Sequence, residues 1–451
     1  MEIKLSDHFT YKRILRFAIP PIIMMVFTSI YGVVDGFFVS NFIRDNGQSF
    51  EAVNFIMPYL MIMGAVGFMF GTGGGALIAK HLGMGEREKA NSLFSLFIYL
   101  PAILGVILAI VGLLFLKPMA ILLGAENGSA LLNLSLRYGQ ICLIGLPFAM
   151  LQIEFQGLFA TAEKPKLGLL FTVISGVTNI ILDAVLVAWL QWGIEGAAIA
   201  TVISQIIGCV GPIIYFARKN SSLLRLTKFK FDGRATLQAC LNGSSELMTN
   251  VSMSLVGMLY NLQLIKYAEG YGIKAYGTLM YVNFIFISVF IGYTVAVAPI
   301  ISYNYGAQNH KELKSILKKS IVILGVMSIL MFIAAELLAT PMSYMFTSYD
   351  SFLLEKTKEA FFFYSFSFLF SGFAIFASSF FTALNNGIIS AIISFLRMLV
   401  FQVVAVYTLP LLFGVEENKV IGIWLSVVVA EFLAVIISSI FLIAKRKKYN
   451  Y

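Results

Sequence analysis

Charged residues are scarce in this chain of 451 residues: they make up 12% of it, against roughly 25% in an ordinary soluble domain. Hydrophobic residues make up 59%, and the mean hydropathy is +0.87. A soluble fold of this length could not bury so much apolar surface. No polar stretch between residues 14 and 444 is long enough for a soluble domain, so the composition predicts a protein that lies in the membrane throughout.

Cysteine and histidine are equally sparse, with three residues of each type. The cysteines are far apart in apolar surroundings, which excludes a disulfide framework and predicts small buried side chains: Cys142, Cys209 and Cys240. The histidines all fall in segments expected to be cytoplasmic: His8, His81 and His310. A membrane-embedded enzyme would need a metal cluster or a nucleophile–base set, so we expect no catalytic residues and no cofactor.

Long apolar segments are what the sequence does contain. A helix needs about 20 apolar residues to cross a bilayer. Six segments of this length lie near residues 14–40, 52–79, 91–116, 133–160, 167–190 and 196–217. Six more lie near 236–264, 275–304, 315–338, 358–384, 388–412 and 420–444. The first has no small-residue cleavage site, so we expect an all-α protein of twelve transmembrane helices without a removable signal peptide.

Basic residues predict the orientation of these spans. With a cytoplasmic N-terminus, 23 of the 32 Lys and Arg residues fall in cytoplasmic segments and 7 in outer segments. Cytoplasmic loops of membrane proteins carry the excess of basic residues. We therefore expect a multi-pass protein of the cell membrane with both termini in the cytoplasm, and the net charge of +9 needs no nucleic-acid partner.

The two sets of six spans resemble each other in sequence. Residues 82–89 after the second span match 305–312 after the eighth at an offset of 223, and 157–162 match 379–384 at an offset of 222. Two further matches share an offset of 226: Gly196 with Gly422, and Gln205 with Glu431. We expect two parallel six-helix lobes, related by a pseudo-two-fold axis along the membrane normal, which suits alternating access. The lobes would be 1–217 and 236–451, joined by a cytoplasmic linker at 218–235.

Two motifs within the spans predict local geometry. The run from Gly71 to Gly75 has no strand before it and no Lys-Ser/Thr after it, so it predicts close helix packing or a bend and not a phosphate loop. Prolines inside spans predict kinks at Pro20, Pro21, Pro58, Pro147, Pro212 and Pro299.

Charged side chains within the spans are candidates for function, because each costs about 2.5–3.5 kcal/mol at the bilayer centre on insertion scales. They are Asp35, Arg137, Glu154, Asp183, Glu246, Glu336, Arg397 and Glu431. Arg137 and Glu336 lie near outer ends, where they can extend to the interface.

Four oxygen-bearing residues should share one depth below the outer surface. They are Asp35 in the first span, Asn179 and Asp183 one turn apart in the fifth, and Thr201 in the sixth. Two carboxylates, an amide oxygen and a hydroxyl could hold Na⁺, and the same carboxylates could take a proton. The alternative is that the two aspartates only cap or tie helices.

Other polar residues could line a substrate cavity: Gln152, Glu154, Gln156, Glu246 and Arg397. Each has a structural alternative. The three residues of the fourth span could form interhelical hydrogen bonds, Glu246 could face cytoplasmic water, and Arg397 is better suited to pairing with an acid or carbonyl than to contacting a cationic substrate. The 41 Phe, 20 Tyr and 19 Met could contribute walls for flat organic cations.

Five segments together resemble the multidrug and toxic compound extrusion (MATE) family, nearest its bacterial MepA-like and DinF-like branches, over essentially the whole chain. The segments are Ser29 to Phe38, Ala79 to Gly83, Leu158 to Pro165, Asn179 to Asp183, and Gly193 to Thr201. The resemblance implies a two-lobed, twelve-helix antiporter that exchanges H⁺ or Na⁺ for organic substrates. It also implies a cation site in the first lobe at the aspartates of spans one and five, Asn179 and Thr201.

The resemblance is incomplete in the second lobe. In the NorM-like branch, acids of helices seven and ten form a second cation site. Span ten here has no acid beyond Glu359 at its outer edge, and Glu246 lies too early in span seven. We therefore expect no second-lobe cation site.

We expect small organic cations and membrane lipid as partners, and a monomer. The alternative within transport is a flippase for lipid-linked saccharides, which would need a strongly cationic cavity, yet deep arginines are nearly absent. A passive channel or a membrane-embedded enzyme are alternatives of other classes. A channel would have no need of duplicated lobes with acids concentrated in one of them.

Overall fold

Helices make up almost the whole computed structural model, which describes residues 3–45, 47–268, 271–347, 350–413 and 416–451 and contains no strand within them. The first half consists of α1 (Tyr11–Phe42), α2 with η1 and α3 (Gln48–Met69, Phe70–Gly74, Gly75–Gly83), α4 (Arg87–Leu122), α5 with α6 (Ala130–Ile144, Leu146–Thr161), α7 with η2 (Pro165–Asp183, Ala184–Trp189) and α8 (Gly193–Ala217).

The second half repeats this order of elements. It consists of α9 (Gly233–Tyr267), α10 (Tyr271–Gly306), α11 (His310–Thr347), α12 with α13 (Ser351–Ser365, Phe368–Ala383), α14 with η3 and α15 (Gly387–Phe395, Leu396–Val400, Phe401–Leu412) and α16 (Glu416–Tyr449). The described chain thus forms twelve spans in two lobes of six, and the all-α prediction is confirmed.

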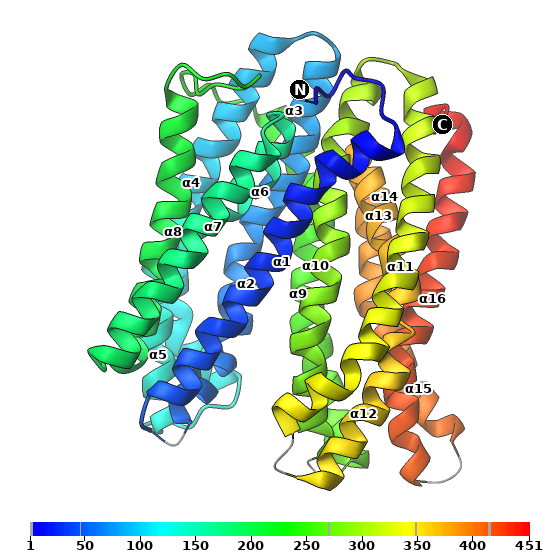
Figure 1. Ribbon diagram of the computed structural model, residues 1–451. Helices are drawn as coiled ribbons and strands as arrows, with labels where there is room; N and C mark the ends of the chain where they lie inside the picture. The colour runs from blue at the N-terminus through cyan, green and yellow to red at the C-terminus, as the bar shows by residue number, and fades with distance from the viewer. Residues whose placement is uncertain (1–2, 46, 269–270, 348–349, 414–415) are drawn as a thin grey trace.

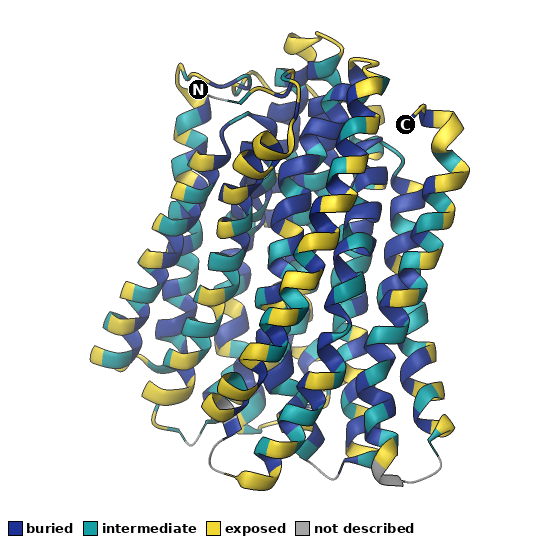
Figure 2. Cartoon of the chain, turned by 45° about the vertical axis from the view of Figure 1, so that its right-hand side comes forward, coloured by how far each residue is buried: buried dark blue, intermediate teal, exposed yellow. Residues whose placement is uncertain are grey.

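Hydropathy alone does not identify all twelve spans in the described chain. Nine helical spans are long and apolar enough to cross a bilayer unaided, and two pairs, α5 with α6 and α12 with α13, do so as bent spans. The remaining span, α9, has 35 residues but many polar ones, because it packs against helices of both halves. Figure 2 shows exposed residues along the outer faces of the bundle; large apolar ones such as Leu114 and Leu337 are 70% and 72% exposed, as lipid-facing residues would be.

Breaks in the helices occur only partly at proline. The fourth span bends by 60° between α5 and α6, next to Pro147, as predicted. The tenth bends by 47° between α12 and α13 without a proline, while α1 continues through Pro20 and Pro21. The π-helical segment η2 ends span five, whereas η3 lies in the middle of span eleven, between α14 and α15.

Matched helix contacts show that the halves are structural repeats. A Cβ atom on Gly196 would lie 3.3 Å from the backbone oxygen of Leu186, and one on Gly422 would lie 2.9 Å from the Cα of Pro410. These pairs join spans five and six in the first half and spans eleven and twelve in the second. The same tight helix crossing therefore occurs at matched positions.

The two halves meet at the end of the molecule that carries both termini, which we call the terminus end (Figure 1). There Gly83 of α3 and Gly306 of α10, matched residues of the repeat, contact each other's helices. A Cβ on Gly83 would overlap with the carbonyl oxygen of Tyr303, and one on Gly306 with that of Lys80. Toward the opposite end the helices of the two halves diverge (Figure 1).

A non-helical N-terminal segment, residues 3–10, forms hydrogen bonds with both halves at the terminus end, and we call it the N-terminal strap. The backbone N–H of Leu5 donates to Glu163 Oε1 in the first half at 2.5 Å. The backbone N–H of Phe9 donates to Glu312 Oε1 on α11 of the second half at 2.8 Å. Leu5 and Phe9 are fully buried, so the strap is part of the packed structure.

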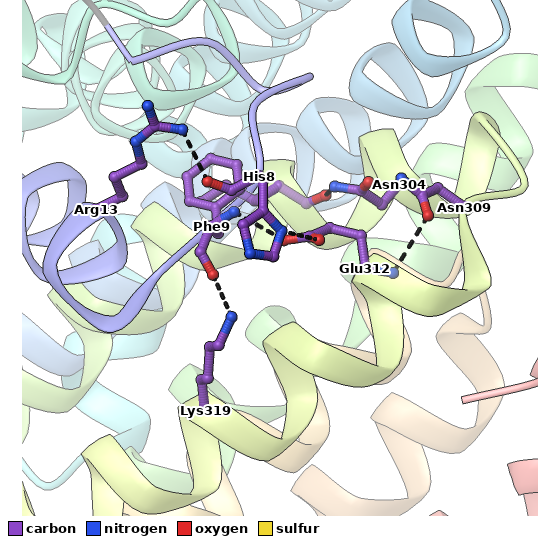
Figure 3. A network of polar contacts seen from close by, with 8 residues as sticks. His8, Phe9, Arg13, Asn304, Asn309, Glu312 and Lys319 are labelled. Atoms are coloured by element: carbon purple, nitrogen blue, oxygen red, sulfur yellow. Dashed lines mark hydrogen bonds and ion pairs between the residues drawn. The ribbon is translucent and has the colours of Figure 1, made fainter.

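Figure 3 shows how the second half holds the strap. The Nδ1 atom of His8 lies 2.7 Å from Glu312 Oε2, and the ammonium group of Lys319 donates to the carbonyl oxygen of Phe9. One carboxylate and one ammonium group of α11 thus bind three backbone or side-chain groups of the strap.

Replacing Glu312 should loosen the strap without unfolding the bundle. Glu312→Ala removes the acceptor of the Phe9 N–H and the partner of His8; a hydrogen bond to a charged group contributes about 1.5–3 kcal/mol. We expect backbone amides of residues 5–10 to exchange hydrogen about 10- to 100-fold faster, as measured by mass spectrometry. Glu86→Ala is a matched control, because Glu86 pairs with His81 at 2.6 Å within one half. Equal exchange in both variants would contradict the assignment.

Candidate functional site

Asp35 of α1 and Asp183 of α7 face each other inside the first half. The two carboxyl groups interact electrostatically, and their helices pack against each other. Asp183 is fully buried and Asp35 half-buried. The structure therefore brings together the two acids that the sequence placed at one depth on different spans.

The oxygen atoms of this pair have no hydrogen-bond donor from the described residues. Both carboxyl oxygens of Asp183, Oδ1 of Asp35 and Oδ1 of the neighbouring Asn179 are buried without a partner. An ionised carboxylate can only accept hydrogen bonds, and an isolated buried charge is costly. Chemically, such a group of oxygens can hold a proton or coordinate a cation.

The sequence of α7 explains where the cluster lies. Thr172, Ser175, Asn179 and Asp183 follow at intervals of 3, 4 and 4 residues, so they form one polar stripe of the helix, and all four are buried. The α-helical part of the span ends at Asp183, where η2 begins. Single π-helical turns within helices are often found at functional sites.

The fourth predicted ligand lies on α8, which packs against both α1 and α7, and two residues that the sequence analysis did not assign to the site interact electrostatically with the pair. Thr201 is half-buried on α8, and its hydroxyl forms no hydrogen bond with the described residues. Tyr138 and Cys142, one turn apart on α5, lie close to the carboxyl groups of the pair. Comparing depths along span four, as was done for the other spans, would have found them.

Gln152 and Gln156 tie α6 to neighbouring helices. Gln152 Nε2 donates to Ser175 Oγ at 2.8 Å, and Gln156 Nε2 donates to Thr28 Oγ1 of α1 at 3.5 Å. Both line a small pocket between α6, α7 and α8, together with the rings of Phe155, Phe159 and Phe171. Glu154, between the two glutamines in sequence, is fully buried, and neither of its carboxyl oxygens has a partner among the described residues.

Glu246 and Arg397 lie in the second half. Arg397 Nε donates to both carboxyl oxygens of Glu431, at 3.0 and 2.8 Å, and both side chains of this pair are buried. This is the pairing with an acid that the sequence favoured over substrate contact. Glu246 is half-buried on α9 and interacts electrostatically with Arg397. The five predicted cavity residues are thus divided between the two halves.

Charged residues nearer the helix ends have simple partners. Arg137 pairs with the exposed Glu195 at 3.1 Å, and Glu336 accepts a hydrogen bond from Ser365.

Comparison with known proteins identifies relatives over most of the chain. The family model MatE matches residues 20–185 and 247–408. Multidrug export protein MepA of Staphylococcus haemolyticus (strain JCSC1435) is 30% identical over 318 residues, which cover 70% of this chain and 69% of that protein. MepA of Staphylococcus aureus (strain MRSA252) is 27% identical over 371 residues, 80% of each chain. A crystal structure of MATE in the straight conformation superposes with a TM-score of 0.91 at 22% identity, covering 98% of both chains.

The Arg397–Glu431 pair should be needed as a unit. Arg397→Met leaves Glu431 buried without a counter-charge, which should lower the free energy of unfolding by about 3–5 kcal/mol. The double variant Arg397→Met/Glu431→Leu removes both charges and should regain most of that stability. Thermal unfolding in detergent would measure both. Arg137→Met is the matched control at an exposed pair, where about 0–1 kcal/mol is expected. A double variant as unstable as Arg397→Met would contradict this account.

Proposed function

The chain belongs to the MATE family of multidrug efflux transporters, and on this premise we propose that it is a cation-coupled antiporter that exports small cationic amphipathic compounds by alternating access. It is a multi-pass membrane protein. The coupling ion would be H⁺ or Na⁺, bound in the first half at Asp35, Asn179 and Asp183, with Thr201 as a further oxygen ligand when the site is filled.

The observation that carries the proposal is the set of buried acceptor oxygens without a donor at Asp35, Asn179 and Asp183. Helix capping or tying would give these oxygens N–H or O–H partners. A mobile positive ion would bind to these oxygens in one state of the cycle and dissociate in another. Such a difference in binding between two states is the requirement for coupling.

Helix α1 is suited to transmit ion binding to the lobes, because it packs against α7 of its own half and α10 of the other. A Cβ on Gly292 of α10 would lie 2.5 Å from the Cα of Ile22, so the two helices touch through their backbones there. Neutralising the Asp35–Asp183 pair would remove repulsion between α1 and α7. A shift of α1 near Pro20 and Pro21 would then change its contact with the second half and release substrate.

The excess of basic residues at the terminus end supports a cytoplasmic location for that end. With the halves joined there and divergent at the opposite end, the arrangement corresponds to an outward-open state. Ion release to the cytoplasm would follow separation of the halves at the terminus end and would reset the carrier.

The charges of the side chains deep in the bundle favour an exporter of cationic substrates over a flippase for pyrophosphate-linked lipids. Arg397 is the basic residue that lies deep in the second half, and Glu431 neutralises it. Among the described residues, Asp35, Asp183 and Glu246 have no basic partner in direct contact. The two MepA proteins are named as multidrug exporters.

Loss of either acid of the pair should uncouple transport. In vesicles with an imposed pH or Na⁺ gradient, Asp35→Asn and Asp183→Asn should slow gradient-driven efflux of a fluorescent organic cation at least about tenfold, since each removes more than about 1.4 kcal/mol of ion binding. Glu336→Gln, which changes an acid bonded to Ser365, is the matched control.

Unaltered efflux in both aspartate variants would refute the role given to the pair. Measuring substrate affinity with and without Na⁺ at fixed pH separates the two coupling ions, because only a Na⁺-coupled carrier should respond to Na⁺ alone.

A further inference from the structure

Glu154 of α6 is a second buried acid in the first half, and the cycle described above does not use it. Its side chain is fully buried, and both carboxyl oxygens have no hydrogen-bond partner among the described residues. The glutamines on either side donate to Ser175 and Thr28, on other helices. No amide of these two residues is therefore bonded to Glu154.

The helices around α6 offer Glu154 no counter-charge. Cys209 of α8 interacts with Glu154 electrostatically, and no charged side chain of the described residues does so, on α1, α2, η1, α3, α4, α5, α7, α8 or α10. An ionised carboxylate in such a place would cost several kcal/mol, so the group holds a proton here.

The backbone of the second span contacts α6 directly at Glu154. Gly67 and Gly71 lie one turn apart on the second span and face α6: a Cβ on Gly67 would lie 2.6 Å from Met150 O, and one on Gly71 3.1 Å from the Cα of Glu154. From the other side, a Cβ on Gly157 would lie 3.2 Å from Gly71 O. At Gly67 a Cβ would overlap with α6, and at Gly71 and Gly157 it would push the two helices apart. The close approach of the second span to α6 at this level therefore depends on glycine.

The segment that contacts the Glu154 backbone also forms part of the contact between the two halves. Gly71 and Gly73 both belong to η1 (Phe70–Gly74). While Gly71 faces α6, a Cβ on Gly73 would lie 2.5 Å from the backbone nitrogen of Gly243 on α9 of the second half. The π-helical segment is thus held between α6 and α9, and separation of the halves at the terminus end would remove α9 from it.

We propose that Glu154 is a proton-binding site whose occupancy depends on conformation: it keeps its proton while η1 is held between α6 and α9, and loses it to water when the halves separate at the terminus end. The O–H bond of the carboxylic acid breaks, the proton passes to water, and a carboxylate remains. The same group takes a proton from water before the halves close again. This inference rests on the proposed alternating-access function, but it needs neither Asp35 nor Asp183.

The sign of the pH dependence follows from linkage. Because the closed terminus end binds the proton more tightly, raising the pH favours separation of the halves there. For one proton, the ratio of closed to open molecules falls by at most about tenfold per pH unit.

The test measures the distance between the halves at the terminus end as a function of pH. Spin labels at Lys89→Cys and Lys314→Cys, two exposed positions at the starts of α4 and α11, report the distance by double electron–electron resonance in lipid nanodiscs. All proteins carry alanine at the three native cysteines and the changes Asp35→Asn and Asp183→Asn. The effect of Glu154 is then observed even if the proposed coupling at the aspartate pair is wrong.

Glu154→Gln imitates the protonated acid in size and charge. In the parent, we expect the fraction of molecules with separated halves to rise with pH. The ratio of open to closed molecules should rise by at most about tenfold per pH unit. The variant should stay closed at the terminus end at every pH, while the control Glu336→Gln should follow the parent. The proposal would be overturned if the fraction of separated halves in Glu154→Gln changed with pH as it does in the parent. A fraction that differed from the parent's by the same factor at every pH would overturn it too.

Infrared spectroscopy tests the protonation state directly. The carbonyl band of a protonated carboxylic acid should be present in the parent at neutral pH and lose intensity in Glu154→Gln and in Glu154→Ala. An unchanged band in both variants would mean that Glu154 is ionised in the closed state, and the proposal would fail.

Discussion

A carboxylate buried among apolar helices must be neutralised, because neither water nor lipid tails can solvate its charge. The protein meets this constraint in two ways. In the second half, Glu431 is neutralised permanently by Arg397, which donates to both of its oxygens. In the first half, the oxygens of Asp183 and Glu154 have no partner from the described residues. The proposed function assigns these unpartnered acids to the binding and release of ions.

The same constraint connects ion binding to the movement of the lobes. The helix pairs that surround the unpartnered acids also touch the other half: α1 carries Asp35 and packs on α10, and η1 covers Glu154 and packs on α9. A change of charge at either acid therefore affects a helical segment that forms part of the contact between the two halves. The N-terminal strap joins the halves at the same end of the molecule, through Glu163 in one and Glu312 in the other.

Much of this could be predicted from the residues. The apolar segments predicted all twelve spans to within a few residues at most ends, including α9, whose polar residues hide it from a test of hydropathy alone. The repeat was visible because matched helix crossings need matched small residues, such as Gly196 and Gly422. The bend between α12 and α13 was not predicted, since it lacks the proline that marks the bend between α5 and α6.

The sequence by itself determined the membrane class, the duplicated halves and the identity of the buried acids, since each depends on composition or on periodic spacing along single helices. Tertiary structure alone decided which acids face one another. Spacing gives the depth of Asp35, Asp183, Glu154 or Glu431 in the bilayer, but not the rotation of one helix against the next. Only the packing of α1 on α7, of η1 on α6 and of η3 beside α16 distinguishes an acid with a permanent partner from one that needs a mobile ion.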